Sequence, residues 1–122
     1  MNTHLPLLYV ALGGFLGSAS RYIVYEWLYS PMDTFFVNVA GSFLLGFLIY
    51  YFEYAGASSS RLKLFLGIGF LGSFTTFSTF IIQTIEMNPL LAMLNIVANI
   101  GIAIIAVYLA RTGAIMYQKR VW

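Results

Sequence analysis

The sequence predicts an all-α membrane protein with four transmembrane helices per subunit. Of its 122 residues, 61% are hydrophobic and 8% are charged, with a mean hydropathy of +0.87; soluble domains carry about 25% charged residues. The charges leave four uninterrupted gaps, at residues 1–20, 34–52, 64–85 and 87–110. Each gap is close to the ~20 apolar residues that cross a ~30 Å hydrocarbon core. Little chain remains outside them, so we expect one transmembrane domain over residues 1–122.

Turn residues divide the chain into four predicted helices. The first covers about residues 5–28 and is followed by a turn at 29–33. The second covers 34–54, with Asp33 placed as its N-cap, and a polar loop follows at 55–60. The third covers 62–86, Asn88 and Pro89 form a tight turn, and the fourth reaches Arg111 or a little beyond.

Composition excludes several classes of function. Cysteine is absent, which removes thiol chemistry and disulfide scaffolds. The single histidine, His4, lies at the amino end without neighbouring metal-ligand residues. No nucleophile–base pair or metal-ligand cluster is visible, so we expect neither an enzyme nor a nucleic-acid-binding protein.

The third segment contains the strongest local anomaly. Gly67, Gly69 and Gly72 lead into residues 73–80, of which five carry hydroxyl groups, and three of these five are threonines, which are weak helix formers. The segment's charge-free window is centred on Phe74 and Thr75. A break there would leave backbone groups at membrane depth that need protein, water or an ion, and such breaks usually mark ion or substrate sites. The alternative is a continuous helix whose threonines bond back to their own backbone.

Polar residues in the other helices also need an explanation. Glycines at helical spacing in the first two helices are accounted for by close helix packing, but Asn38 and Arg21 are not. Arg21 either attracts anions at a pore vestibule or extends to the membrane interface. Asn95 and Asn99 form a polar stripe four residues apart, for which interhelical hydrogen bonding is the simpler interpretation.

Three motifs resemble those of one family. Residues 69–80, GFLGSFTTFSTF, are similar to the core motif of the Fluc/CrcB fluoride channels. The other two, in the family's order, are Gly14-x-x-Gly17-x-x-x-Arg21 and Val37-Asn38-x-x-Gly41-Ser42-x-x-x-Gly46. The resemblance covers nearly the whole chain.

The resemblance implies a dimer of two oppositely oriented subunits, with two fluoride pores and a structural sodium ion at the centre. The sodium ligands would be the backbone carbonyls of Gly72 and Thr75. Only residues at the midplane can share one ion across an in-plane twofold axis, and Thr75 lies there by counting. By the same resemblance, the pore residues would be Asn38, Phe77, Ser78, Thr79, Phe80, Asn95 and Asn99, with Arg21 in the vestibule. The amide of Asn38 would donate to the ion, and the electropositive ring edges of Phe77 and Phe80 would contact it; without the motif, these rings would be assigned to core or lipid packing.

The expected function is passive export of fluoride from the cytoplasm, which relieves fluoride toxicity. The acidic residues lie at or outside the ends of the charge-free windows, so we expect none at the centre of the membrane. This argues against proton-coupled transport, which normally uses a carboxylate inside the membrane. A small dual-topology multidrug exporter is the alternative, but that class needs an acid in its first helix, and residues 1–20 contain none. A membrane scaffold without transport activity would not need midplane hydroxyls.

Two features depart from the family pattern. Gln83 stands where members often carry Glu. The basic residues also lie mainly on one predicted side, at Arg61, Lys63, Arg111, Lys119 and Arg120, which favours cytoplasmic termini. A subunit that inserts equally in both directions should have almost no such bias. Whether the antiparallel partner is a second copy or an oppositely oriented paralogue therefore stays open. In either case we expect a multi-pass protein of the cell (plasma) membrane, the inner membrane of a prokaryote.

Overall fold

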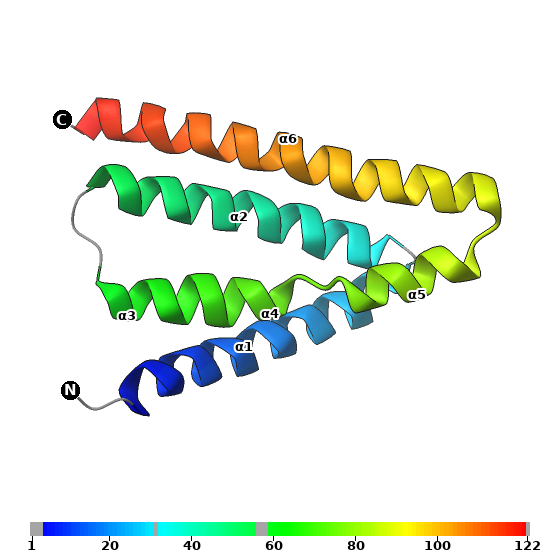
Figure 1. Ribbon diagram of the computed structural model, residues 1–122, viewed down its shortest axis with the longest axis horizontal. Coiled ribbons are helices and arrows are strands. Elements are labelled where there is room, and N and C mark those ends of the chain that lie inside the picture. Colours follow the sequence, from blue (N-terminus) through cyan, green and yellow to red (C-terminus); the bar gives the residue numbers. More distant parts are fainter. Residues whose placement is uncertain (1–3, 31, 56–58, 122) are drawn as a thin grey trace.

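The described part of the chain is entirely helical apart from short connections. A computed structural model describes residues 4–30, 32–55 and 59–121, and within them four segments are long and apolar enough to span a membrane: His4–Leu28, Asp33–Tyr54, Ser60–Glu86 and Pro89–Val121. These segments lie side by side as an elongated bundle (Figure 1). The prediction of four membrane-spanning segments is confirmed.

The first two helices are joined by a short turn. Helix α1 covers His4–Leu28 and helix α2 covers Asp33–Ala55. Tyr29 ends α1 in a left-handed conformation, with φ of 42°, a common way to terminate a helix. Asp33 is the first residue of α2, and its carboxylate accepts hydrogen bonds from the backbone and hydroxyl groups of Thr34. Parts of the two predicted connections, residue 31 of the turn and residues 56–58 of the loop, lie outside the described residues.

The third segment consists of four helical pieces. Helix α3 (Ser60–Leu62) leads into η1 (Lys63–Leu71), which is wound as a π-helix, and α4 (Gly72–Phe74) follows it directly. Helix α5 begins only at Ser78 and ends at Glu86. Residues 75–77 therefore connect two helices end to end, as the thin stretch between α4 and α5 in Figure 1 shows. π-helical turns are rare and frequently found at functional sites.

The fourth segment is longer than the sequence indicated. Helix α6 covers Pro89–Val121, with Asn88 as its N-cap, because the Asn88 side chain accepts a hydrogen bond from the Leu91 backbone at 3.0 Å. The prediction that it ends near Arg111 is wrong. No proline follows Arg111, and the side chain of Gln118 donates to the Tyr51 carbonyl at 3.0 Å, which ties this last part of α6 to α2.

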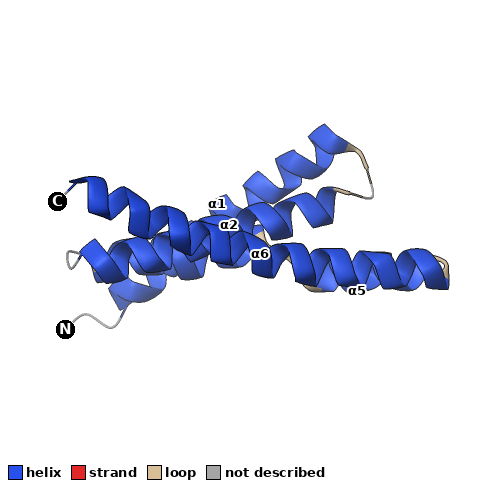
Figure 2. Ribbon diagram, turned by 90° about the horizontal axis from the view of Figure 1, so that it is seen from above, coloured by secondary structure: helices blue, strands red, loops and turns tan. Residues whose placement is uncertain are grey.

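Close packing joins the helices in two pairs, α1 with η1 and α2 with α6. A Cβ atom placed on Gly13 would lie 2.2 Å from the Phe65 carbonyl oxygen, and one placed on Gly17 would lie 2.1 Å from the Phe70 carbonyl oxygen. Only glycine allows α1 to approach η1 this closely. Packing at Gly46 in the second pair is less restrictive, since a Cβ there would lie 3.2 Å from a side-chain methyl of Val107. The α1–α2 hairpin diverges from α5 and α6 toward one end of the bundle (Figure 2).

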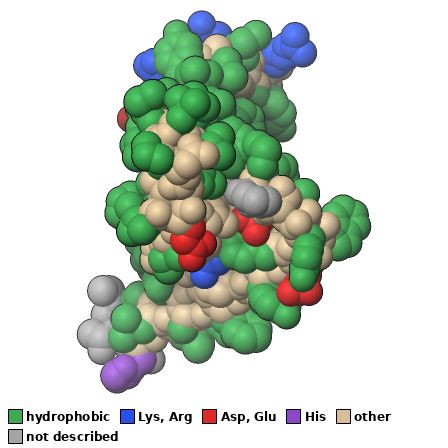
Figure 3. Space-filling view, turned by 90° about the vertical axis from the view of Figure 1, so that its right-hand side faces the viewer, with side chains coloured by type: hydrophobic (Ala, Val, Ile, Leu, Met, Phe, Trp, Pro, Cys, Tyr) green, Lys and Arg blue, Asp and Glu red, His purple; other side chains and the backbone are tan. Residues whose placement is uncertain are grey.

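Charge is distributed unequally between the two ends of the bundle. Arg61, Lys119 and Arg120 lie at the end where α3 begins and α6 finishes. The opposite end, which faces the viewer in Figure 3, presents acidic side chains. These belong to Glu26, Asp33 and Glu86, which line one pocket there. The structure therefore places the basic loop and the carboxy end on one side, as the sequence predicted.

Candidate functional site

The candidate site is built around the interruption of the third segment. Thr75 is extended, with φ of −74° and ψ of 159°, and the helix resumes at Ser78. In a continuous α-helix, the Gly72 carbonyl would accept from the Thr76 N–H, and the Thr75 carbonyl from the Thr79 N–H. Both N–H groups instead donate to side-chain oxygens, of Asn38 and Thr76 respectively. Neither carbonyl keeps its helical donor.

The side chain of Asn38 replaces the hydrogen bonds lost at the interruption. Its Oδ1 accepts from the Thr76 N–H at 2.8 Å, and its Nδ2 donates to the Thr76 carbonyl at 2.9 Å. The same Nδ2 donates to Oδ1 of Asn99 at 3.4 Å. An amide has two N–H hydrogens, and both are used here by protein acceptors. Contact between Asn38 and an ion stays a prediction.

The hydroxyl of Thr76 starts the next helix. It accepts from the Thr79 N–H at 3.3 Å and donates to the Thr79 hydroxyl at 3.1 Å. It also lies 3.5 Å from the hydroxyl of Ser78. This arrangement supplies an acceptor that the first turn of a helix otherwise lacks. Thr76 therefore connects the interruption to two helices. Its backbone is hydrogen-bonded to Asn38 of α2, and its side chain is hydrogen-bonded to Thr79 of α5.

Two asparagines of α6 extend the polar contacts toward α5. Asn99 is buried and donates to Oδ1 of Asn95 at 2.9 Å, and Asn95 donates to the Thr84 hydroxyl at 2.9 Å. Thr84 in turn donates to the Phe80 carbonyl at 2.7 Å. The interpretation of Asn95 and Asn99 as interhelical hydrogen-bonding residues is confirmed within the subunit. Together with Asn38 they form a continuous polar track from α2 through α6 to α5.

A groove of about 380 Å³ opens beside the Asn38–Asn99 end of this track. Its polar and aromatic lining comprises Asn38, Ser42, Thr75, Thr76, Phe77, Phe80 and Asn99. The two rings lie 5.8 Å apart between centroids, tilted by 44°. Phe80 is buried, at 5% exposure, whereas Phe77 is 74% exposed on the subunit surface. The structure thus brings together Asn38, Asn99 and both phenylalanines, while Ser78, Thr79 and Asn95 join them through hydrogen bonds.

Of the remaining predicted residues, Arg21 belongs to α1. Thr75 also lines the groove, and Gly72 lines a separate pocket together with Leu45 and Leu48 of α2. The Thr75 carbonyl accepts a hydrogen bond from Nη1 of Arg21 at 3.2 Å. Arg21 is half-buried against this carbonyl. Gly72 is exposed on the surface of the subunit. Within the described residues, no group of three or more His, Cys, Asp and Glu side chains is placed to hold a metal ion.

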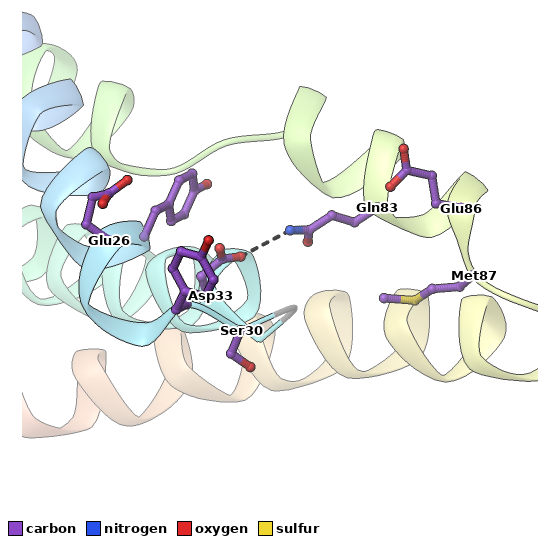
Figure 4. A pocket seen from close by; sticks show the side chains of 8 residues that line it. Glu26, Ser30, Asp33, Gln83, Glu86 and Met87 are labelled. Carbon is purple, nitrogen blue, oxygen red and sulfur yellow. Dashed lines mark hydrogen bonds between the residues drawn. The ribbon is translucent and has the colours of Figure 1, made fainter.

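A second pocket, of about 530 Å³, opens at the acidic end between the α1–α2 turn and α5 (Figure 4). Gln83 points across it and donates to the Asp33 carboxylate at 3.1 Å. Glu26 and Glu86 also line this pocket. An amide at position 83 complements Asp33, whereas a glutamate there would place two carboxylates together. The departure at Gln83 therefore has a local physical reason.

Sequence reasoning missed three residues of the site. Ser42 lines the groove one helical turn after Asn38, a position that its four-residue spacing could have indicated. Thr76 was recognised within the hydroxyl-rich run but not as the residue to which Asn38 binds. Thr84 receives the hydrogen bond from Asn95, and nothing in the sequence pattern pairs these two residues.

The fold and the site together define a small multi-pass integral membrane protein with an interrupted third segment and, beside it, a largely apolar groove that contains two phenylalanines and a few polar side chains. A family model described as "CrcB-like protein, Camphor Resistance (CrcB)" matches residues 8–111. The chain belongs to this family, whose members are not enzymes, and the match does not favour the multidrug exporter.

Curated relatives match over most of the chain. A fluoride-specific ion channel FluC 1 of Methanospirillum hungatei is 44% identical over 113 residues, covering 93% of this chain and 80% of the relative. Methanosarcina barkeri has two such relatives. Its FluC 2 is 42% identical, covering 84% of this chain and 82% of the relative; its FluC 3 is 36% identical, covering 89% of each.

Proposed function

We propose that this protein is a fluoride-selective channel that passively exports fluoride across the plasma membrane of a prokaryotic cell. The observation that carries the proposal is the groove beside the interrupted third segment, where Asn38, Thr76, Phe80 and Asn99 meet. The relatives' names, fluoride-specific ion channel, give the ion. Their similarity extends over nearly all of this chain.

The groove supplies the kind of contacts that a small, strongly hydrated anion requires. Ring edges are electropositive, and Phe77 and Phe80 lie within one groove at an angle to each other. The groove is also lined by the hydroxyl-bearing residues Ser42, Thr75 and Thr76, and hydroxyl groups can donate to an anion. Weak contacts of both kinds attract an anion without holding it, which conduction requires.

The working unit in this proposal is an antiparallel dimer with a structural sodium ion at its centre. The Gly72 and Thr75 carbonyls would be the ligands, because both have lost their helical donors and carbonyl oxygens suit hard cations. The Thr75 carbonyl accepts from Arg21 with one lone pair, which leaves its second lone pair for the ion. Two carbonyls from each subunit would give four oxygen ligands. Replacement of sodium by N-methyl-D-glucamine should then weaken the dimer of purified protein; a dimer fraction equal in both media would contradict the sodium site.

The concentration of basic residues at one end of the bundle bears on the identity of the second subunit in the dimer. The basic end of the bundle favours the cytoplasm, so one orientation should predominate when this chain is expressed alone. A reporter fused to the C-terminus and scored on both membrane sides distinguishes the two arrangements. A signal on both sides supports an antiparallel homodimer, whereas a cytoplasmic signal alone supports an oppositely oriented paralogue as the partner.

Liposomes that contain the purified protein test the function itself. With a fluoride gradient and a potassium ionophore to carry the countercharge, an electrode should record rapid fluoride efflux. The same liposomes loaded with chloride should show efflux at least a hundredfold slower. Equal rates for the two anions, or no fluoride efflux, would overturn the proposed function.

A further inference from the structure

Arg21 and Asn38 hold the same peptide group from opposite sides. The Thr75 carbonyl, which accepts from Arg21 at 3.2 Å, and the Thr76 N–H, which donates to Asn38 at 2.8 Å, belong to one planar peptide unit. In a trans peptide, the C=O and N–H bonds point in opposite directions. Arg21 belongs to α1 and Asn38 to α2, so side chains of two helices fix the tilt of this plane.

Glycine packing brings Arg21 within reach of the interruption. Helices α1 and η1 run in the same direction side by side (Figure 1), in contact at Gly13, Gly17 and Gly69. Arg21 lies one helical turn beyond Gly17 on the same face of α1. Since Gly17 contacts Phe70, the residue opposite Arg21 is farther along the third segment, at Thr75.

The hydrogen bond from Arg21 replaces the one that the Thr75 carbonyl loses at the interruption. A carbonyl that has lost its helical donor inside a membrane protein requires another partner. Hydrogen bonds from a charged donor are roughly twice as strong as neutral ones. Arg21 therefore stabilises the interrupted conformation at Thr75, two residues before Phe77.

We propose that Arg21 is a positioning residue that fixes the Thr75–Thr76 peptide plane, and through it the groove beside Phe77, rather than a charge that attracts anions at a pore mouth. This inference rests on the proposed function, because the groove is taken as the fluoride path. It concerns the geometry of the interruption, so it also predicts changes that can be measured without fluoride.

Lysine and glutamine at position 21 separate the two roles. Lysine keeps the positive charge but presents a compact ammonium instead of a planar fork of donors. An attracting charge would survive Arg21→Lys, and the defect of Arg21→Gln would shrink at high ionic strength because salt screens exposed charges. A positioning residue would not be replaced by lysine, and its loss would be independent of salt.

The experiment compares fluoride efflux of the wild type, Arg21→Lys and Arg21→Gln at low and high ionic strength, and hydrogen exchange of the amides at residues 76–79. Arg61→Gln, at an exposed position of α3, is the matched control. We expect both Arg21 variants to lose at least tenfold in efflux at either ionic strength. We also expect at least tenfold faster exchange at Thr76 and Thr79, and no change in the control.

Two results would overturn the inference. One is wild-type efflux of Arg21→Lys together with a salt-dependent defect of Arg21→Gln, and the other is unchanged amide exchange in both variants. If Arg21→Gln does not fold, Arg21→Lys alone decides by the same two readouts. If the wild type itself conducts no fluoride, the proposed function fails, while the exchange data still decide whether Arg21 holds the peptide plane.

Discussion

Asn38 pairs with the backbone of Thr76 as a neighbouring peptide group would, accepting from its N–H and donating to its carbonyl. The two residues are 38 positions apart and belong to different spans. This pairing compensates the backbone for the interruption of the third segment, because unpaired peptide groups are costly at membrane depth. Asn38 therefore stabilises the interrupted conformation from the α2 side.

Asn38→Asp should reduce fluoride efflux at least tenfold while the protein still folds. A carboxylate cannot donate to the Thr76 carbonyl, so one hydrogen bond is lost, and a negative charge enters the groove. Efflux from liposomes is the measurement, and size-exclusion chromatography reports the fold. Asn88→Asp is the control, since Asn88 caps α6 and aspartate caps equally well. Wild-type efflux in Asn38→Asp would place the ion path elsewhere.

Phe80→Ile should also reduce efflux at least tenfold. Isoleucine fills most of the buried space but has no electropositive ring edge. Phe36→Ile is the matched control because Phe36 is exposed on α2 and lies outside the groove. Equal efflux in the two variants would show that the Phe80 ring does not contact the ion.

Gly17→Ala should destabilise the protein by about 1–3 kcal/mol, the usual range for overpacking. Its Cβ would lie 2.1 Å from the Phe70 carbonyl oxygen, so α1 must move away from η1. Gly113→Ala should have no such effect, since a Cβ there meets nothing within 4 Å, and it should stabilise α6 by up to about 1 kcal/mol. Thermal unfolding in detergent measures both. A Gly17→Ala variant as stable as Gly113→Ala would contradict the close α1–η1 packing.

Gln83→Glu should lower stability more than Gln83→Leu. Leucine removes the hydrogen bond to Asp33, at 3.1 Å in the wild type, which costs about 1.5–3 kcal/mol for a charged acceptor. Glutamate removes the donor and adds repulsion between two carboxylates. The comparison uses unfolding temperatures in the same detergent. Equal stability of Gln83→Glu and the wild type would show that Asp33 does not depend on an amide partner.

Patterns in the sequence were sufficient to predict the four membrane-spanning segments and the unequal distribution of charge between the two ends of the bundle. Charge-free windows gave the number of segments, and turn residues placed the ends of those around residues 5–28 and 34–54 to within one or two residues of the observed ends. The end of α6 was not located, because the charge-free window stops before Arg111 whereas the helix continues to Val121. A single charged residue does not end a helix, and no proline follows Arg111.

The site was predicted as a set of residues but not as a set of bonds. The motifs indicated Asn38, Phe77 and Phe80, and the polar stripe of the fourth helix indicated Asn99; the structure gathers these four at one groove. It could not show that both amide hydrogens of Asn38 are used within the chain. Pairings between residues on different spans depend on helix rotation and close approach, which local spacing does not determine.

The reversal potential of the current through a planar bilayer tests the central claim most directly. With the purified channel between solutions of fluoride on one side and chloride on the other, only a permeant anion sets the potential at which current vanishes. We expect a large reversal potential, of the sign that arises when fluoride crosses the bilayer and chloride does not. A value near zero, or one set by chloride, would contradict the central claim.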